Sequence, residues 1–146
     1  MRDTPQKPSE NLHPAPEGPV IFFDGVCGLC DRWVDFVLKR DASGQFRFAP
    51  LQGESAREWL NLADDQALRS VVLVEPQGTF RKSAAVARIL IRLGGRWALC
   101  GQALRLIPPV LRDWGYDFIA GRRYRWFGKK ESCRLPSAAE RDRFLA

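Results

Sequence analysis

The spacing of hydrophobic and polar residues changes several times between residues 20 and 93, and each change predicts a new element of secondary structure. Short runs that are rich in β-branched and aromatic residues, or that alternate apolar with polar positions, predict strands. Apolar residues that recur every three or four positions predict helices with one buried face. These rules place strands at residues 20–23, 45–51, 70–74 and 79–81, and helical stripes at residues 33–38, 54–62 and 84–93.

Proline, glycine and serine mark the boundaries of the later elements. Pro76-Gln77-Gly78 is a turn sequence between two strand-like runs, so we expect a hairpin there. Ser83 stands directly before the third helical stripe and is predicted to be its N-cap. Gly94-Gly95 follows that stripe and is predicted to end it, because glycine is favoured just beyond a helix C-terminus.

The sequence beyond residue 96 is predicted to be mostly helical. Residues 97–107 and 110–120 are amphipathic, and Pro108-Pro109 separates them because proline disrupts a helix interior. A basic and aromatic stretch, RRYRWFGKK, follows at residues 122–130. Ser137-x-x-Glu140 has the form of a capping box, which predicts a last short helix.

Two cysteines lie where the first strand should give way to the first helix. Cys27 and Cys30 have CxxC spacing and follow Asp24-Gly25, which ends the apolar run. The first N–H groups of a helix have no acceptor within it, and the helix dipole is positive there, so a thiolate at that end is stabilised. Such surroundings lower a cysteine pKa from about 8.5 to about 3.5–7.5. We expect Cys27, nearer the loop, to attack a disulfide and Cys30 to resolve the mixed disulfide.

Asp24 is the third candidate site residue, three positions before Cys27. A partly buried carboxylate at the end of the strand can accept the proton of the Cys30 thiol and return it. It can equally fix the turn or cap the helix by accepting hydrogen bonds from backbone N–H groups. Both roles stay open, and we expect the charge of Asp24 to point away from Cys27, because a nearby negative charge would raise the pKa of that thiol.

The CxxC pair has two other interpretations, a metal site and a pair of inert thiols. Structural zinc usually has four Cys or His ligands, typically as two spaced pairs. Cys100, Cys133 and His13 do not form a second pair, so we predict no metal and no organic cofactor. Cys100 is expected to be a small buried hydrophobic residue of its helix. Cys133 is expected to pack against the domain, with a role as a third thiol as the alternative.

Length and composition favour one domain. The chain has 146 residues, of which 45% are hydrophobic, enough for a single core. Residues 1–18 are rich in proline and lack apolar periodicity, so they are predicted to be a flexible tail before a domain at residues 19–146. We see neither a secretory signal nor an apolar run of about 18 residues, and we therefore expect no membrane span and a cytoplasmic location. In that compartment CxxC is more often catalytic or metal-binding than structural.

Charge is distributed unevenly along the chain. Residues 1–73 carry 8 basic and 11 acidic side chains, whereas residues 74–146 carry 15 basic and 6 acidic ones. The stretch at residues 122–130 combines cations with aromatic rings, as single-strand nucleic-acid surfaces do. We favour a helix whose Tyr124, Trp126 and Phe127 pack inward while the cations stay in water, because no second nucleic-acid motif accompanies the stretch. The alternative function is a basic module that binds nucleic acid or an acidic protein and uses CxxC as a redox or metal sensor.

The order β-α-β-α-β-β-α, with CxxC after the first strand, predicts an α/β fold. It predicts a thioredoxin-like sheet with a helical C-terminal extension from about residue 97. Sequential βα units favour a parallel pair of strands, and the hairpin adds an antiparallel edge.

Several motifs resemble the DCC family of predicted thiol-disulfide oxidoreductases. Residues 24–30, DGVCGLC, resemble its DxxCxxC signature, and the likeness continues through residues 48–52, 83–93, 121–128 and 133–136. The resemblance implies a thioredoxin-like fold, with the signature residues at Asp24, Cys27 and Cys30. It also implies an enzyme that exchanges disulfides with a protein or small-molecule partner.

Overall fold

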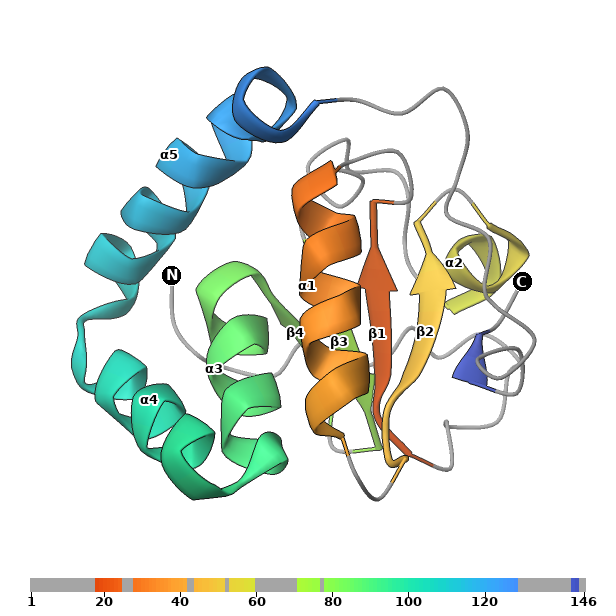
Figure 1. The fold of residues 1–146 in the computed structure, drawn as a ribbon, viewed down its shortest axis with the longest axis horizontal. Helices are drawn as coiled ribbons and strands as arrows, with labels where there is room; N and C mark the ends of the chain where they lie inside the picture. Colours follow the sequence, from red (N-terminus) through yellow and green to blue (C-terminus); the bar gives the residue numbers. More distant parts are fainter. Residues whose placement is uncertain are drawn as a thin grey trace.

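The computed structural model describes residues 18–24, 28–41, 44–51, 53–59, 71–76, 78–128 and 143–144 (Figure 1). These residues form strands and helices in alternation as far as a β-hairpin, which is followed by three consecutive helices. The elements in chain order are β1 (Val20–Phe23), α1 (Gly28–Arg40), β2 (Arg47–Pro50), α2 (Glu54–Trp59), β3 (Val72–Glu75), β4 (Gly78–Arg81), α3 (Lys82–Leu93), α4 (Gly95–Leu106) and α5 (Pro109–Phe127). The predicted α/β class is confirmed.

The four strands form one mixed sheet in the order β2-β1-β3-β4. β1 runs parallel to β2, with Val20 opposite Arg47, and antiparallel to β3, with Val20 opposite Val74. β3 and β4 form the predicted hairpin. β1 is therefore an interior strand, and its C-terminal end lies at the centre of one edge of the sheet.

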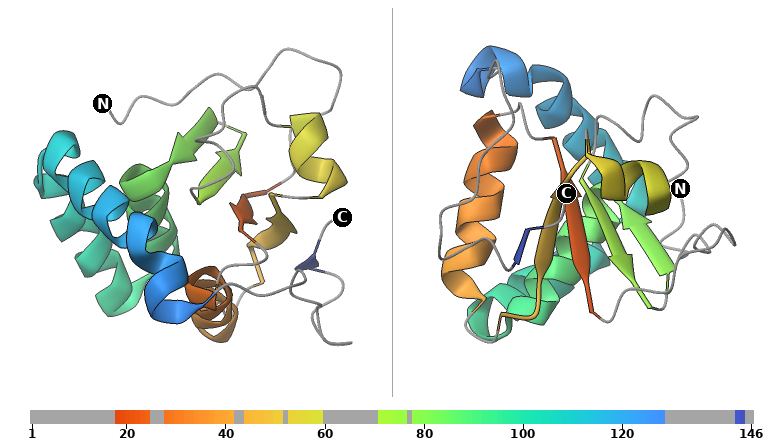
Figure 2. Two further views of the ribbon diagram at one scale, coloured as in Figure 1. Left: turned by 90° about the horizontal axis from the view of Figure 1, so that it is seen from above. Right: turned by 90° about the vertical axis from the view of Figure 1, so that its right-hand side faces the viewer.

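Side chains of β1 alternate between two hydrophobic cores. Ile21 and Phe23 belong to the larger core, whereas Val20 and Phe22 belong to the smaller one on the other face. α1 and α3 cover the first face, and α2 lies on the opposite side (Figure 2). Because both faces are covered, the strand reads as a continuous apolar run rather than as an alternation.

α1 is amphipathic, as its apolar stripe predicts. Val34 and Val37 are fully buried against the sheet, and Trp33 and Phe36 pack at the margin of the larger core. Asp31 lies in the first turn, and Lys39 and Arg40 lie in the last turn, where their charges complement the helix dipole.

The predicted N-cap of α3 is wrong. The helix starts at Lys82, its capping position is Arg81, and Ser83 is buried within the first turn. The Ser83 hydroxyl instead donates a short hydrogen bond to Asp113 of α5. The Ser83 hydroxyl therefore bonds to a residue that is distant in sequence and not to the N-terminus of its own helix.

Glycines determine how α4 follows and packs against α3. Gly94 ends α3 as predicted, with a left-handed φ of 76° that favours glycine. Gly101 is buried against α3, and a Cβ there would lie 2.7 Å from the Ala87 carbonyl oxygen. Only glycine allows the two helices to approach this closely.

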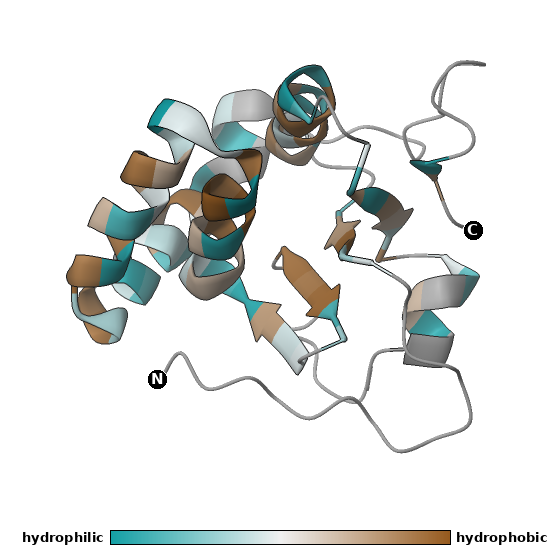
Figure 3. Cartoon of the chain, turned by 90° about the horizontal axis from the view of Figure 1, so that it is seen from below, coloured by the Kyte–Doolittle hydropathy of each residue, from teal (hydrophilic) through white to brown (hydrophobic). Residues whose placement is uncertain are grey.

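α5 joins residues 110–120 and part of the basic stretch in one helix. Its contacts with the rest of the domain include polar ones, from Asp113 to Ser83 and from Asp117 to Lys82 at 3.0 Å. Apolar side chains such as Trp114 and Phe118 are exposed. Figure 3 shows the mixture of hydrophobic and hydrophilic residues along the outer helices.

The predicted inward packing of the basic and aromatic stretch is wrong for Trp126, of which 54% is exposed. The side chains of Tyr124 and Phe127 lie outside the described residues. Trp126 instead contacts Phe118 edge to face, with ring centroids 6.2 Å apart. The outer face of α5 therefore carries connected aromatic rings.

Across the described part of the chain, no helix combines the length and the apolar character needed to cross a membrane. The predicted N-terminal tail up to residue 17 and the predicted capping box at Ser137 and Glu140 lie outside the described residues.

Candidate active site

The candidate site lies where β1 leads into α1. Asp24 directly follows the strand and is 2% exposed, so its carboxyl group is almost completely withdrawn from water. Cys27 belongs to residues 25–27, which lie outside the described residues, and Gly28 is the first residue of α1. The CxxC segment therefore spans the junction between a central strand and a helix.

Cys30 occupies the first turn of α1, three positions from the start of the CxxC segment. It is 8% exposed and belongs to the larger core, together with Val34 and Val71. A sulfur in this place is shielded from bulk solvent but close to the positive end of the helix dipole. These features suit a resolving thiol, which must reach a neighbouring sulfur and not a molecule in solution.

The beginning of α1 is connected to the end of α5. The Gly28 N–H donates a hydrogen bond of 3.2 Å to the Gly128 carbonyl oxygen. Figure 1 shows the last turn of α5 beside the first turn of α1. Gly128 has a φ of 81°, a left-handed conformation in which a side chain is strained. The C-terminal helices thus reach the CxxC junction through a main-chain contact.

Sequence reasoning did not single out Asp31, a buried acidic residue next to Cys30 in the first turn of α1. A carboxylate at this end of a helix is favoured by the dipole, as the thiolate is. An acidic residue directly after the second cysteine was the available signal. The charge of Asp31 therefore contributes to the electrostatic potential around the CxxC segment.

A partly open cavity of about 170 Å³ adjoins Cys30. Its lining is almost entirely apolar and comes from four separate parts of the chain. The lining residues are Leu29, Cys30, Trp33, Val71, Val86, Tyr116, Ile119 and Ala120. Local periodicity could not reveal this cavity, because it exists only where α1, α3, α5 and the start of β3 meet.

Tyr116 fixes one wall of the cavity. Its hydroxyl oxygen accepts a hydrogen bond of 2.8 Å from the Val71 N–H. The Val71 carbonyl oxygen accepts another, of 3.2 Å, from the Lys82 N–H. The main chain at the start of β3 is thereby attached to both α5 and α3.

The predictions for the other two cysteines and for the histidine have different outcomes. The prediction that Cys100 is a buried hydrophobic residue is wrong, since this residue of α4 is exposed. The helix turns Gly101, and not Cys100, toward α3. Cys133 and His13 lie outside the described residues, so their predicted roles stay predictions.

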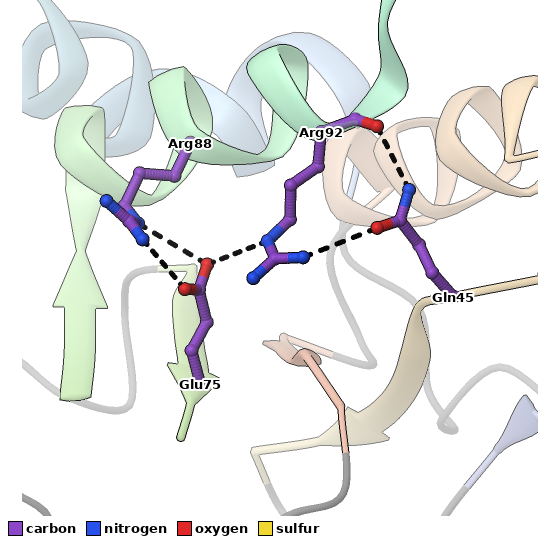
Figure 4. Close-up of polar contacts among 4 residues, drawn as sticks. All are labelled: Gln45, Glu75, Arg88 and Arg92. Carbon is purple, nitrogen blue, oxygen red and sulfur yellow. Dashed lines mark hydrogen bonds and ion pairs between the residues drawn. The ribbon is translucent and has the colours of Figure 1, made fainter. Parts of the chain in front are cut away.

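A second group of charged residues lies at the opposite edge of the sheet. Glu75, at the end of β3, is 0% exposed, and Arg88 Nη2 donates to its carboxylate at 2.8 Å (Figure 4). Arg92 Nε donates to the same carboxylate at 3.1 Å, and the Arg92 guanidinium also contacts Gln45 at 3.4 Å. This Glu75 cluster connects the hairpin to α3 and to the segment before β2.

The two arginines decide the charge state of Glu75. Burial alone would raise the pKa of its carboxyl group, because the charged form loses its hydration. Hydrogen bonds from Arg88 and Arg92, together with their positive charges, outweigh this effect and hold the pKa of Glu75 below its ordinary value. Glu75 is therefore a paired anion in the folded protein.

Comparisons with known proteins agree with the signature at residues 24–30. A family model described as DCC1-like thiol-disulfide oxidoreductase matches residues 21–129. Uncharacterized protein YuxK of Bacillus subtilis (strain 168) is 40% identical over 128 residues, which are 86% of this chain and 93% of that protein. DCC family protein At1g52590, chloroplastic, of Arabidopsis thaliana is 36% identical over 121 residues, which are 80% of this chain and 69% of that protein.

No solved structure matches this chain. The family model covers most of the described domain, from the interior of β1 to the end of α5, and so includes the CxxC junction and the lining of the cavity. The resemblance that the motifs indicated is confirmed. The chain belongs to the DCC1-like thiol-disulfide oxidoreductase family.

Proposed function

We propose that this protein is a thiol-disulfide oxidoreductase that uses Cys27 and Cys30 as its reactive dithiol. The observation that carries the proposal is the position of Cys30, shielded in the first turn of a helix that follows the central strand of the sheet. We further propose that the sheet is thioredoxin-like and that the protein works in a reducing compartment such as the cytoplasm, where structural disulfides are rare.

The reaction consists of two exchanges of sulfur partners. The Cys27 thiolate attacks one sulfur of a substrate disulfide, forms a mixed disulfide with it, and releases the other substrate sulfur as a thiolate that takes up a proton. The Cys30 thiolate then attacks the Cys27 sulfur, and the second substrate thiolate leaves. Two electrons pass to the substrate, and the protein is left with a Cys27–Cys30 disulfide. With an oxidised protein and a dithiol substrate, the same steps run in reverse.

Neighbouring groups prepare the two thiols for these steps. The start of α1 stabilises the Cys27 thiolate, since its first N–H groups and its dipole face that end. The Gly28 N–H donates to Gly128, so in this proposal the thiolate is stabilised by the other N–H groups of the first turn and by the helix dipole. In this proposal, Asp24, buried at the end of β1, accepts the proton that Cys30 must lose before it attacks.

A redox titration with mass spectrometry tests the proposed function. In glutathione buffers between about −320 and −180 mV, the protein should lose and regain two hydrogens reversibly, with the disulfide mapped to Cys27 and Cys30. A Cys100→Ser variant serves as the matched control and should titrate like the wild type, because that thiol lies on α4. Absence of a reversible Cys27–Cys30 disulfide over this range would exclude the proposed function.

The outer face of α5 favours a second candidate function, binding of an acidic protein segment. Trp114 and Phe118 stack with centroids 6.0 Å apart, and the Arg122 guanidinium lies 3.9 Å above the Phe118 ring. Exposed rings beside a cation suit a partner with both apolar and acidic side chains. A polyglutamate peptide that contains phenylalanine should bind in a salt-dependent manner, and less tightly to Arg122→Ala. Equal binding by this variant, or preference for single-stranded DNA, would reject this candidate.

A further inference from the structure

We propose that the cavity beside Cys30 binds an aromatic ring or a branched aliphatic group of a low-molecular-weight thiol or disulfide. This inference rests on the proposed function and adds a class of substrate to it. The cavity combines three properties that together specify such a ligand, namely its apolar lining, its volume, and its contact with the CxxC segment.

The lining excludes a charged or strongly polar occupant. Aliphatic side chains such as Leu29, Val86 and Ile119 supply most of the walls, and the Tyr116 hydroxyl is turned to the main chain of Val71. A charged group would lose its hydration here without gaining a partner of opposite charge among the lining residues. An apolar group gains free energy by the same transfer.

The volume sets the size of that group. An apolar cavity of about 150 Å³ in another protein accommodates a benzene molecule. The cavity of about 170 Å³ therefore suits one phenyl ring or a leucine-sized branched group. Larger ring systems would have to extend out of its open side.

The position of the cavity would place its occupant beside the proposed disulfide exchange. Leu29 lies between the two cysteines in sequence, and both Leu29 and Cys30 line the cavity. A ring in the cavity is therefore next to the thiol that closes the protein disulfide. A short linker, of the length found in benzyl mercaptan, would leave the ligand sulfur beside the CxxC segment.

The main chain beside the cavity disfavours an extended peptide as the partner. Peptides that bind next to a strand usually form main-chain hydrogen bonds to it. At Val71 the N–H is already donated to Tyr116, and the carbonyl oxygen already accepts from Lys82. Recognition at this wall consequently depends on filling the cavity and not on pairing of strands, which favours a small molecule.

The first test uses benzyl alcohol, which has the ring but no sulfur, so that its binding is independent of redox activity. In the reduced wild type it should shift the methyl resonances of Val86 and Ile119. Ala120→Phe, which places a ring in the cavity, should abolish these shifts. Ala103→Phe on the exposed surface of α4 is the matched control and should retain them. Absence of shifts in the wild type, or their persistence in Ala120→Phe, would overturn the proposal.

The second test compares exchange rates with two disulfides, those of benzyl mercaptan and of 2-mercaptoethanol. Burial of the ring should favour the benzyl disulfide about tenfold or more in the wild type and in Ala103→Phe. The ratio of the two rates should fall to about one in Ala120→Phe, and in Val86→Phe as a second filling variant in case the first does not fold. An unchanged ratio in a folded filling variant would contradict the proposal.

The two tests together distinguish failure of the cavity assignment from failure of the proposed function. If neither disulfide exchanges while benzyl alcohol still binds, the redox function is wrong and the cavity assignment stands as an apolar site. If a peptide disulfide with phenylalanine beside cysteine is preferred over benzyl disulfide, and this preference is lost in Ala120→Phe, the cavity belongs to a protein substrate and the small-molecule assignment is overturned.

Discussion

The two edges of the sheet bury ionisable groups in different ways. At one edge the Glu75 carboxylate is enclosed by Arg88 and Arg92, so each charge has a fixed partner from the same chain. At the other edge Cys30 lies in the first turn of a helix and borders a partly open apolar cavity. Charged groups that are already paired within the chain stabilise the fold. A group beside a cavity, in contrast, can form new bonds. We therefore propose that the first edge is structural and that the second carries the chemistry.

Replacing the attacking thiol should produce the largest effect on chemistry. Cys27→Ser should lower the rate of disulfide exchange by about a thousandfold or more, since the mixed disulfide cannot form at a hydroxyl. Because the proposal requires Cys27 to be reachable by a substrate, the free energy of unfolding of this variant should change by no more than about 0.5 kcal/mol. Stopped-flow exchange assays and urea unfolding measure the two quantities. Strong destabilisation with retained exchange would reverse the assignment of the two edges.

Removing both arginines of the Glu75 cluster should produce the opposite result. Arg88→Met combined with Arg92→Met leaves a buried carboxylate without its cations and should cost about 3–5 kcal/mol of stability. The midpoint of the dithiol titration should stay unchanged, because the cluster lies at the far edge of the sheet. The exposed Arg96→Met on α4 is the matched control and should unfold like the wild type. Equal midpoints of unfolding for the double variant and this control would show that the cluster is not structural.

The lowered pKa of Glu75 predicts how stability depends on pH. The folded protein binds fewer protons at this carboxyl group than the unfolded chain does, so the contribution of Glu75 is fully present above the unfolded pKa of about 4.3. The contribution is lost as the pH falls through the lower folded pKa. Urea unfolding between about pH 6 and pH 3 should show this decline, and Glu75→Gln should weaken it.

The pH prediction has a matched control in Glu54, an exposed carboxylate at the start of α2. Glu54→Gln should leave the slope of stability against pH close to that of the wild type. If Glu75→Gln and Glu54→Gln give the same slope, the arginines do not hold the pKa of Glu75 below its ordinary value.

The smallest predicted effect concerns the hydrogen bond between Gly28 and Gly128. Gly128→Ala should cost about 1–2 kcal/mol, because alanine is strained at this left-handed φ although its Cβ would meet no neighbouring atom. The rate of Cys27 alkylation should change with it, since relief of this strain would displace the residue 128 carbonyl that accepts from the start of α1. Gly121→Ala, within α5, is the control and should leave the alkylation rate unchanged. If Cys27 in the Gly128→Ala variant is alkylated at the wild-type rate, α5 does not influence the dithiol.

Local pattern was sufficient for the strands and for the CxxC junction. The run at Val20–Phe23 and the turn at Pro76 depend on residues close together in sequence, so their prediction did not require knowledge of distant partners. The proposed dithiol was likewise identified from spacing alone, and its assignment stays a prediction. The geometry of Cys27 lies outside the described residues, and its role therefore rests on the motif and the family.

The predictions that failed depend on contacts between distant segments. Ser83 is not a cap because its hydroxyl donates a hydrogen bond to Asp113, on a helix that comes later. Cys100 is exposed because the close approach at Gly101 selects which side of α4 meets α3. The apolar cavity has no local signal at all, since Val71 and Ala120 become neighbours only after the chain has folded.

The bond from Gly28 to Gly128 has a consequence for how this family can diversify. Since both partners are backbone atoms, substitutions along the outer surface of α5 can alter which molecules the protein meets without disturbing the connection to the reactive turn. Truncation before Tyr116 would remove the acceptor and one wall of the cavity together. α5 is thus best regarded as an integral part of the unit that carries the CxxC segment rather than as an appendage to it.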